Sequence, residues 1–255
     1  MKKAVSIFAL LAAVVSVLAG CGGRVPPNAV FSTKDLSGKT VGVLEGSAAP
    51  AFLGMAGSIR TYATADALLA DLKNGALDCA VMDRAVFEST KAKGVKSLKE
   101  PLIDQEYRFA VARENPELER AMNEAIKQLK KDGYLEALYQ FYLFGGEKPQ
   151  APQAQNVSGS LTLGVPADFA PFCYLDGDDK AAGLDVDAAR AVCALLGVDL
   201  EVRVVSREEL ITNVEYGRVD FSAGGLVSPE DGGADTVRYT APYAACAQVI
   251  VVRKK

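Results

Sequence analysis

Short apolar runs alternate along this chain with segments whose apolar residues recur at helical spacing. Residues 40–44 (TVGVL) and 77–83 (LDCAVMD) are apolar runs that predict buried strands, the second of them ending at Asp83. Between them, residues 65–75 (ADALLADLKNG) place leucines on one helical face and end at Asn-Gly, which stops a helix. Alternating strands and helices favour an α/β fold with mostly parallel sheets.

The same succession returns in the second half of the chain. LLADLKNGALD at 68–78 and LITNVEYGRVD at 210–220 share an apolar pair, a further apolar residue and Gly-x-x-Asp at matched spacing. We therefore expect two related lobes whose ligand cleft lies at the carboxyl ends of the strands and closes by a hinge. Further strands are predicted at 199–205, 219–225 and 247–255, with one more from residue 160, and further helices at 184–197 and 208–217.

Two helices and a linker separate the halves. ENPELERAMNEAIKQLKKDG at 114–133 predicts a helix that Asn115 caps, with Pro116 in its first turn and its charges placed to complement the helix dipole. Residues 134–146 predict a second, aromatic-rich helix. Residues 147–159 are rich in Pro and Gln and nearly free of large apolar groups, which is typical of a linker.

The first 20 residues do not fit this pattern. Two lysines precede an apolar stretch at 4–19 that is too short to span a membrane as a helix, and Leu-Ala-Gly then precedes Cys21. This is the pattern of a bacterial lipoprotein signal, in which Cys21 receives diacylglycerol and becomes the new N-terminus. The alternative is an ordinary secretory signal with a chance cysteine. Pro26-Pro27 and the neighbouring glycines predict a tether without regular structure.

The composition narrows the chemistry. The chain has no histidine, which excludes a Ser-His-Asp triad, a Cys-His pair and any His-ligated metal. Its net charge is −4 without a basic stripe, so we expect no nucleic-acid partner. No two of the four cysteines after Cys21 are close enough in sequence to form a metal knuckle, so we also expect no metal site. Cys79 and Cys193 fall in apolar patterns and predict small core residues. A disulfide between Cys173 and Cys246 stays open in an exported protein.

Several motifs together resemble a known family. LGVPADFAPFCYLDGDDKAAGLDVDAARAVCALLG and YGRVDFSAGGLVSPE are similar to the first lobe of bacterial extracellular solute-binding proteins of the polar amino acid type, family 3. LSGKTVGVLEGSAAP, LKNGALDCAVMD and LKKDGYLEALYQFYLFGG are similar to the second lobe and the closing helices. The resemblance implies a two-lobed type II periplasmic-binding-protein fold, α/β with mixed, mostly parallel sheets, that delivers a ligand to an ABC transporter.

The order of these parts differs from the family's order. The second lobe and the closing helices come first here, and each part occurs once, which predicts a circular permutation with new ends near the hinge. The resemblance thus divides the chain into a signal peptide (1–20), a tether (21–35), the family's second lobe (36–112), closing helices (113–146), a linker (147–159) and the family's first lobe (160–255).

The resemblance also implies a ligand site between the lobes. Phe169 would stack on the ligand, and Asp83 would pair with the ligand's amino group. The alternatives are a half-buried turn aromatic for Phe169 and a helix cap for Asp83. Backbone groups of two turns and one hydroxyl would complete the site; these belong to Gly46, Ser47, Gly224, Gly225, Leu226 and Ser228.

Two positions depart from the family's pattern. The Arg that usually forks onto the ligand carboxylate is Asp231 here, and the second Thr of a Gly-Thr-Thr turn is Ala48. Arg207 stands where the family often has an aromatic residue, and we hypothesise that it takes over the carboxylate, which guanidinium recognises bidentately. The alternatives are a solvated Arg207 at a helix start and a ligand that has no α-carboxylate.

These features predict a lipid-anchored, extracytoplasmic, monomeric binding protein. It would capture a small polar solute, an amino acid or an amine, for an ABC transporter permease, and would contact the membrane through lipidated Cys21. No cofactor and no enzymatic activity are expected. An exported enzyme on the same fold, similar to cyclohexadienyl dehydratases, is the alternative, and Glu45 is its only candidate acid. A sensory lobe is a third reading of the same fold.

Overall fold

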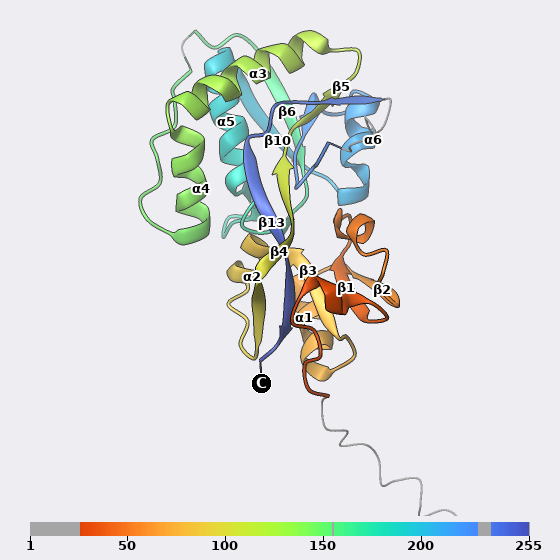
Figure 1. The fold of residues 1–255 in the computed structure, drawn as a ribbon. Coiled ribbons are helices and arrows are strands. Elements are labelled where there is room, and N and C mark those ends of the chain that lie inside the picture. Colours follow the sequence, from red (N-terminus) through yellow and green to blue (C-terminus); the bar gives the residue numbers. More distant parts are fainter. Residues whose placement is uncertain (1–25, 155, 229–235, 255) are drawn as a thin grey trace, which may run out of the picture.

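The computed structural model describes residues 26–154, 156–228 and 236–254, which fold into two α/β lobes joined by two long strands (Figure 1). The predicted signal at 1–20, Cys21 and Asp231 lie outside the described residues. Within the described ranges, no helix has both the length and the apolar character that crossing a membrane requires.

The lower lobe in Figure 1 is built on a five-stranded mixed sheet. Its elements are η2 (Thr33–Leu36), β1 (Thr40–Leu44), η3 (Ala49–Phe52), β2 (Ser58–Tyr62), α1 (Ala65–Asn74), β3 (Cys79–Asp83), α2 (Arg84–Ser89), β4 (Val95–Tyr107) and β13 (Ala244–Arg253). The strand order is β2-β1-β3-β13-β4; β1 runs parallel to β2 and β3, and β13 runs antiparallel to β3 and β4.

The upper lobe holds a second five-stranded sheet and a small three-stranded one. Its elements are β5 (Ala110–Ala112), α3 (Pro116–Lys131), α4 (Tyr134–Phe144), β6 (Ser160–Val165), β7 (Asp168–Phe169), β8 (Cys173–Leu175), β9 (Ala181–Ala182), α5 (Leu184–Leu196), β10 (Asp199–Val204), η4 (Arg207–Glu209), α6 (Leu210–Glu215), β11 (Phe221–Ser222) and β12 (Val237–Tyr239). The order of the larger sheet is β10-β6-β11-β5-β12. Asn115 caps α3 as predicted, since its side chain accepts from the Leu118 N–H at 3.1 Å.

Both large sheets have the same topology. Each sheet contains three parallel strands, and the first of these in the chain (β1 or β6) lies between the second (β2 or β10) and the third (β3 or β11). The fourth place belongs to an antiparallel strand that is far away in sequence, β13 below and β5 above. The expectation of an α/β fold with mixed sheets is confirmed; in the two large sheets half of the neighbouring pairs are parallel and half are antiparallel.

The repeated Gly-x-x-Asp motif performs the same structural task in both lobes. The Asp78 carboxylate accepts from the Thr40 N–H at 2.8 Å, and the Asp78 N–H donates to the Thr40 carbonyl at 2.9 Å. Asp220 makes the same two bonds with Thr162, at 2.7 and 2.9 Å. The motif therefore ties the start of the third strand to the start of the first, which explains why it recurs at matched spacing.

The two lobes are connected by an antiparallel pair of strands. β4 and β13 pair from Tyr107–Ala244 near the upper lobe to Val95–Arg253 at the far end of the lower lobe. Beyond this ladder β4 leads into β5 of the upper sheet, and β12 of that sheet leads into β13. Each sheet thus contains a strand from the other part of the chain, and the predicted boundaries at 112 and 160 stay a prediction.

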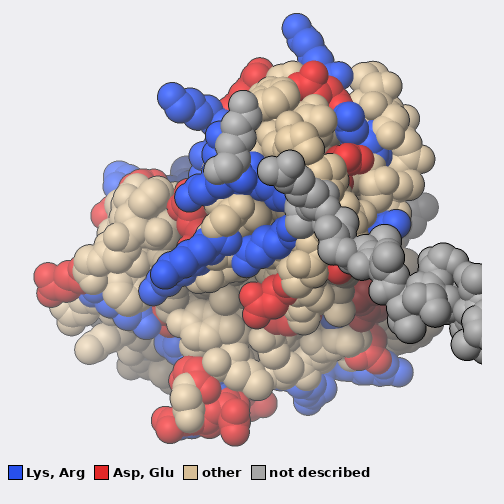
Figure 2. Space-filling model, turned by 90° about the horizontal axis from the view of Figure 1, so that it is seen from below, with Lys and Arg blue, Asp and Glu red and all other residues tan. Residues whose placement is uncertain are grey.

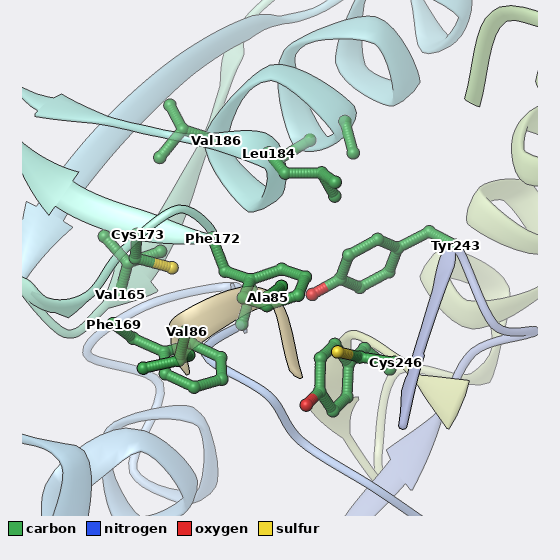
Figure 3. Packing of buried hydrophobic residues seen from close by; sticks show 14 of the residues in the cluster. Ala85, Val86, Val165, Phe169, Phe172, Cys173, Leu184, Val186, Tyr243 and Cys246 are labelled. Carbon is green, nitrogen blue, oxygen red and sulfur yellow. The ribbon is translucent and has the colours of Figure 1, made fainter. Parts of the chain in front are cut away.

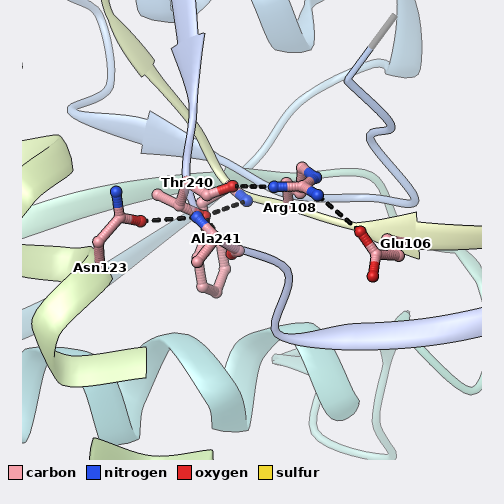
Figure 4. A network of polar contacts seen from close by, with 6 residues as sticks. Glu106, Arg108, Asn123, Thr240 and Ala241 are labelled. Atoms are coloured by element: carbon pink, nitrogen blue, oxygen red, sulfur yellow. Dashed lines mark hydrogen bonds and ion pairs between the residues drawn. The ribbon is translucent and has the colours of Figure 1, made fainter. Parts of the chain in front are cut away.

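Polar contacts tie the two connections together where they enter the upper lobe (Figure 4). The Arg108 guanidinium donates to the Thr240 carbonyl at 2.8 Å and to the Glu106 carboxylate at 2.6 Å. The Ala241 N–H donates to the Asn123 side chain of α3 at 2.6 Å. These bonds hold the upper end of the connection, so we expect any bending between the lobes to occur in the adjoining backbone.

The segment predicted as a tether (21–35) is bound to the lower lobe over much of its described length. Val30 is fully buried, η2 follows it, and the Pro26 carbonyl accepts from the Arg253 Nε at 3.2 Å. The apolar Val30 side chain explains this packing, which the Pro and Gly content concealed. Both ends of the described chain therefore lie together at the base of the lower lobe, not near the hinge as expected.

The cysteines after residue 25 are all free and buried. Cys79 and Cys193 lie in the core as predicted. Cys173 and Cys246 are not bridged, and in Figure 3 they lie on opposite sides of the Phe172 ring. The disulfide that the sequence left open is therefore absent from this structure.

Removing the aspartate of either Gly-x-x-Asp motif, Asp78 or Asp220, should destabilise the fold. We expect Asp78→Ala and Asp220→Ala each to lower the free energy of unfolding by about 1–2 kcal/mol, because each deletes a charge-assisted bond to a backbone N–H. Urea denaturation measures the change. The matched control is Asp199→Ala. Asp199 is exposed, lies at the start of a strand, and its side chain makes no hydrogen bond within the described chain. Equal changes in the free energy of unfolding for all three variants would contradict a stabilising role of the two motif aspartates.

Candidate functional site

An aromatic cluster lies where the two lobes meet (Figure 3). Phe169 is only 5% exposed; its ring stacks on Phe172 with centroids 5.0 Å apart and meets Tyr107 edge-on at 6.1 Å. Ala85 and Val86 of α2, from the lower lobe, belong to the same cluster. Phe169 is therefore held rigidly, with one face packed and the other available to a polar neighbour.

That neighbour is Arg207, on η4. Its guanidinium carbon lies 4.7 Å from the centroid of the Phe169 ring, a cation–π arrangement. One Nη donates to the Gly224 carbonyl at 2.8 Å, and the other lies 3.3 Å from the Asp168 carboxylate. The Arg207 side chain is 14% exposed, so it is not a solvated residue at a helix start.

The turn after β1 reaches Arg207 from the opposite lobe. A Cβ on Gly46 would lie 2.2 Å from the Arg207 Cδ, and the Gly46 φ of +66° also favours glycine. Gly225 has the same relation to Phe169, since a Cβ there would lie 2.8 Å from the ring. Two glycines thus let backbone from both lobes approach the stacked pair.

Asp83 ends β3 and is 4% exposed. Burial raises its pKa to about 6, although the Gln248 and Cys246 side chains and the charge of Arg207 act in the other direction. Its Oδ1 has no hydrogen-bond partner, and the same is true of the Gln248 Oε1 and the Gln105 Nε2. A buried carboxylate with an unpaired oxygen is suited to receive an ammonium group.

Asp185 is a second buried carboxylate, which the sequence analysis did not single out. It lies in the first turn of α5, is fully buried, and accepts from the Cys173 Sγ at 3.0 Å. Burial raises its pKa to about 6 as well, and Arg207 again acts to lower it. The charge of Arg207 therefore stabilises two buried carboxylates at once.

The structure brings together most of the residues that the sequence predicts for the site. Phe169, Arg207, Gly46, Gly224 and Gly225 meet at the junction, and Asp83 lies within electrostatic reach of Arg207.

Three predicted residues make other contacts or none. The Ser47 hydroxyl accepts from the Ala49 N–H at 3.1 Å, and the Leu226 carbonyl accepts from the Arg108 N–H at 2.9 Å. Ser228 is half-buried at the end of a described segment. The ligand-binding role of all these residues stays a prediction.

Three polar residues at the site were missed, and two of them carried a signal in the sequence. Gln248 is a lone amide in the apolar strand AQVIVV, and Asp185 falls on the face of α5 that is otherwise apolar. Gln105, which accepts from Gln248 at 3.1 Å, lies in a strand that the hydrophobic pattern did not predict.

An open pocket of about 610 Å³ lies on the outer side of Arg207, between the lobes. Glu45 contributes from the lower lobe, and Asp168, Arg207 and Asn213 contribute from the upper lobe. Among the residues that the structure describes, no group of His, Cys, Asp and Glu side chains could hold a metal ion.

Comparisons with known proteins fit this geometry. Residues 161–255 match the family model of bacterial extracellular solute-binding proteins, family 3. The chain is 31% identical over 94 residues to the arginine-binding extracellular protein ArtP of Bacillus subtilis, covering 37% of this chain and 36% of that protein. It is 33% identical over 69 residues to the probable ABC transporter arginine-binding protein ArtJ of Chlamydia trachomatis, covering 27% of each. The matches thus span roughly a third of these relatives' length.

Among solved structures, a phosphate-binding protein of a phosphate ABC transporter from Streptococcus pneumoniae aligns with 85% of this chain and 88% of its own. The identity is 11% and the TM-score 0.46, so the fold rests on the sheets described above and not on this likeness.

The described chain thus forms two α/β lobes with a polar and aromatic junction between them. The match to family 3 of the bacterial extracellular solute-binding proteins, over residues 161–255, agrees with the resemblance that the sequence showed. The family, ArtP and ArtJ are binding proteins and not enzymes, in agreement with the expectation that this chain has no catalytic activity.

A side chain at Gly46 should separate the lobes. We expect Gly46→Ala to push Arg207 away from the turn and to increase the radius of gyration measured by small-angle X-ray scattering. Gly38→Ala is the control, because Gly38 has a similar φ of +71° but nothing within 4 Å of the added Cβ. An unchanged radius in Gly46→Ala would show that this contact does not hold the lobes together.

Stability should increase as the pH falls. The folded pKa of Asp83, about 6, exceeds its ordinary value of 3.8, so the folded state binds the proton more tightly. Its destabilising effect is complete above pH 6 and disappears towards pH 4. Lowering the pH from 7 to 5 should raise the free energy of unfolding by about 1 kcal/mol through protonation of Asp83. Asp83→Asn should remove that part of the pH dependence. Urea unfolding at the two pH values tests this, with the exposed Asp104→Asn as control.

Proposed function

We propose that this chain is a lipid-anchored, extracytoplasmic binding protein that captures a small polar, amino-acid-like solute for an ABC importer. The observation that carries the proposal is the junction itself. There a buried Asp83 with an unpaired oxygen and Arg207 stacked on Phe169 lie between two lobes joined by a strand pair. Hinged closure would bury the solute against these groups.

Each charged group has a defined task in this proposal. The Asp83 carboxylate receives the ammonium group of the solute, and it is ionised above its pKa of about 6. Phe169 offers its outer face to the solute, which requires Arg207 to leave that face. Once displaced, Arg207 can fork onto a carboxylate, and it then substitutes for the arginine that the family usually carries at the position of Asp231.

A ligand without a carboxylate is a second candidate, and one observation favours it. Both Nη atoms of Arg207 are already engaged, one by the Gly224 carbonyl and one by Asp168. If these contacts persist, Arg207 has little capacity left for a carboxylate, and the solute is an amine. The enzyme alternative gains no such support, because Glu45 is exposed and lines an open pocket.

We also propose that the chain is circularly permuted. Three observations support this: the family model begins at residue 161, the linker joins α4 to β6 within one lobe, and Arg253 bonds to Pro26. Lys148 of the linker pairs with Asp187 of α5 at 2.5 Å, which holds the joint against the upper lobe. Ends that lie together in the fold are what a permutation requires.

A ligand screen tests the proposed function. Thermal shift against the amino acids and their decarboxylated amines should reveal at least one solute that raises the melting temperature by several degrees, since a ligand at 1,000 times its Kd stabilises by about 4 kcal/mol. Asp83→Asn should weaken binding at least tenfold for either class of solute. Arg207→Ala should weaken a carboxylate-bearing solute about thirtyfold and leave an amine unaffected.

The exposed Asp104→Asn is the control and should bind like the unmodified chain. Turnover of a solute in the same screen would overturn the binding function and favour an enzyme. If Asp83→Asn binds the solute with unchanged affinity, Asp83 is not part of the binding site, but the proposed binding function still stands.

A further inference from the structure

The end of the lower lobe farthest from the upper lobe carries a group of lysines that come from distant parts of the sequence. Figure 2, which views the molecule from this end, shows Lys and Arg side chains gathered in a band across the face. We call this group the basic edge, and it consists of Lys39, Lys73, Lys93, Lys96 and Lys254.

The topology of the lower sheet places these residues together. Lys39 directly precedes β1, and Lys73 lies in the last turn of α1, where the Leu72 carbonyl accepts from the Arg253 guanidinium at 2.8 Å. Lys96 pairs with Val252 in the ladder between β4 and β13.

The last members of the edge are joined through the backbone. The Lys254 N–H donates to the Gly94 carbonyl at 2.8 Å, beside Lys93. All five lysines therefore surround the same end of the sheet, where β1 and β4 begin and β13 ends.

The positive charge of the basic edge is not neutralised by ion pairs, although Lys39 interacts electrostatically with Asp35. Within the described chain, none of its ammonium groups lies within ion-pair distance of a carboxylate, and all but Lys39 are exposed. The Asp78 carboxylate, at the same end, is engaged with the Thr40 N–H. The whole chain has 32 acidic and 28 basic residues, so this face has the opposite sign to the molecule's net charge.

The chain leaves the folded lobe at the basic edge. The Pro26 carbonyl is held by Arg253, and Val30 is fully buried, so the fold begins close to Pro26. Cys21 precedes Pro26 by five positions, which span at most about 18 Å when fully extended. A lipid on Cys21 would thus hold this face within one or two Debye lengths of the bilayer surface.

We propose that the basic edge rests on anionic lipid headgroups and gives the anchored protein a fixed orientation, with the lower lobe on the membrane and the upper lobe away from it. The proposal rests on the proposed lipid anchor for that orientation, but the surface should bind anionic lipid without it. Each lysine near such a surface strengthens binding about fivefold, which complements the anchor.

Vesicle co-sedimentation tests the surface alone. The chain from residue 21 on, carrying Cys21→Ser, contains every described element and cannot be lipidated. We expect it to bind vesicles containing about one third phosphatidylglycerol at low salt, to bind phosphatidylcholine vesicles much less, and to lose binding as salt rises. The triple change Lys73→Glu, Lys93→Glu and Lys96→Glu should weaken binding at least tenfold.

The matched control reverses three exposed lysines of the upper lobe, with Lys130→Glu, Lys131→Glu and Lys180→Glu, and so produces the same net charge. An equal loss of vesicle binding in the two triple variants, or no preference for the anionic vesicles, would overturn the proposal that the basic edge binds anionic lipid. Fatty-acid labelling of Cys21 in cells tests the anchor separately. If Cys21 is labelled in cells but the unlipidated chain does not bind anionic vesicles, the lipid anchor is supported and the lipid-binding role of the basic edge is refuted.

Discussion

The pairing of β4 with β13 is the interaction on which the rest of the structure depends. This ladder supplies two strands to the lower sheet, and its continuations supply two strands to the upper sheet. Because both connections run side by side, they offer one axis for rotation of the lobes, which would leave both sheets intact and separate the apolar contacts of α2 with the Phe169 cluster.

The junction above this ladder concentrates groups that are costly to bury. Asp83 and Asp185 each have an oxygen without a partner, and Arg207 is the cation that acts on both. Unpaired buried carboxylates destabilise a fold, so their presence at the meeting surface of two lobes indicates a site built for something other than stability. Closing on a cationic group would satisfy the carboxylates, which is the role that the proposed function gives to Asp83.

Much of this arrangement could be predicted from the sequence, and the failures have physical reasons. β1, β3, α1 and α3 follow from apolar periodicity and from caps such as Asn115, which are local signals. β4 contains Lys, Glu and Pro and is half exposed, so it is a strand because β13 pairs with it. The stacking of Arg207 on Phe169 joins residues 38 positions apart (207 minus 169), and no local pattern encodes it. The lysines of the basic edge are equally scattered, which is why the chain shows no basic stripe.

The place of β13 in the lower sheet has a consequence for how the protein is made. β13 lies between β3 and β4, yet it is formed by Ala244–Arg253, whereas its neighbours precede residue 108. The lobe that is synthesised first therefore lacks an inner strand until β13 has been synthesised, and until then β3 and β4 present unpaired backbone edges. The upper lobe can assemble its sheet earlier, from segments that end at β12. In this chain the N-terminal lobe is the last to be finished, in contrast to the usual domain-by-domain order of folding during synthesis.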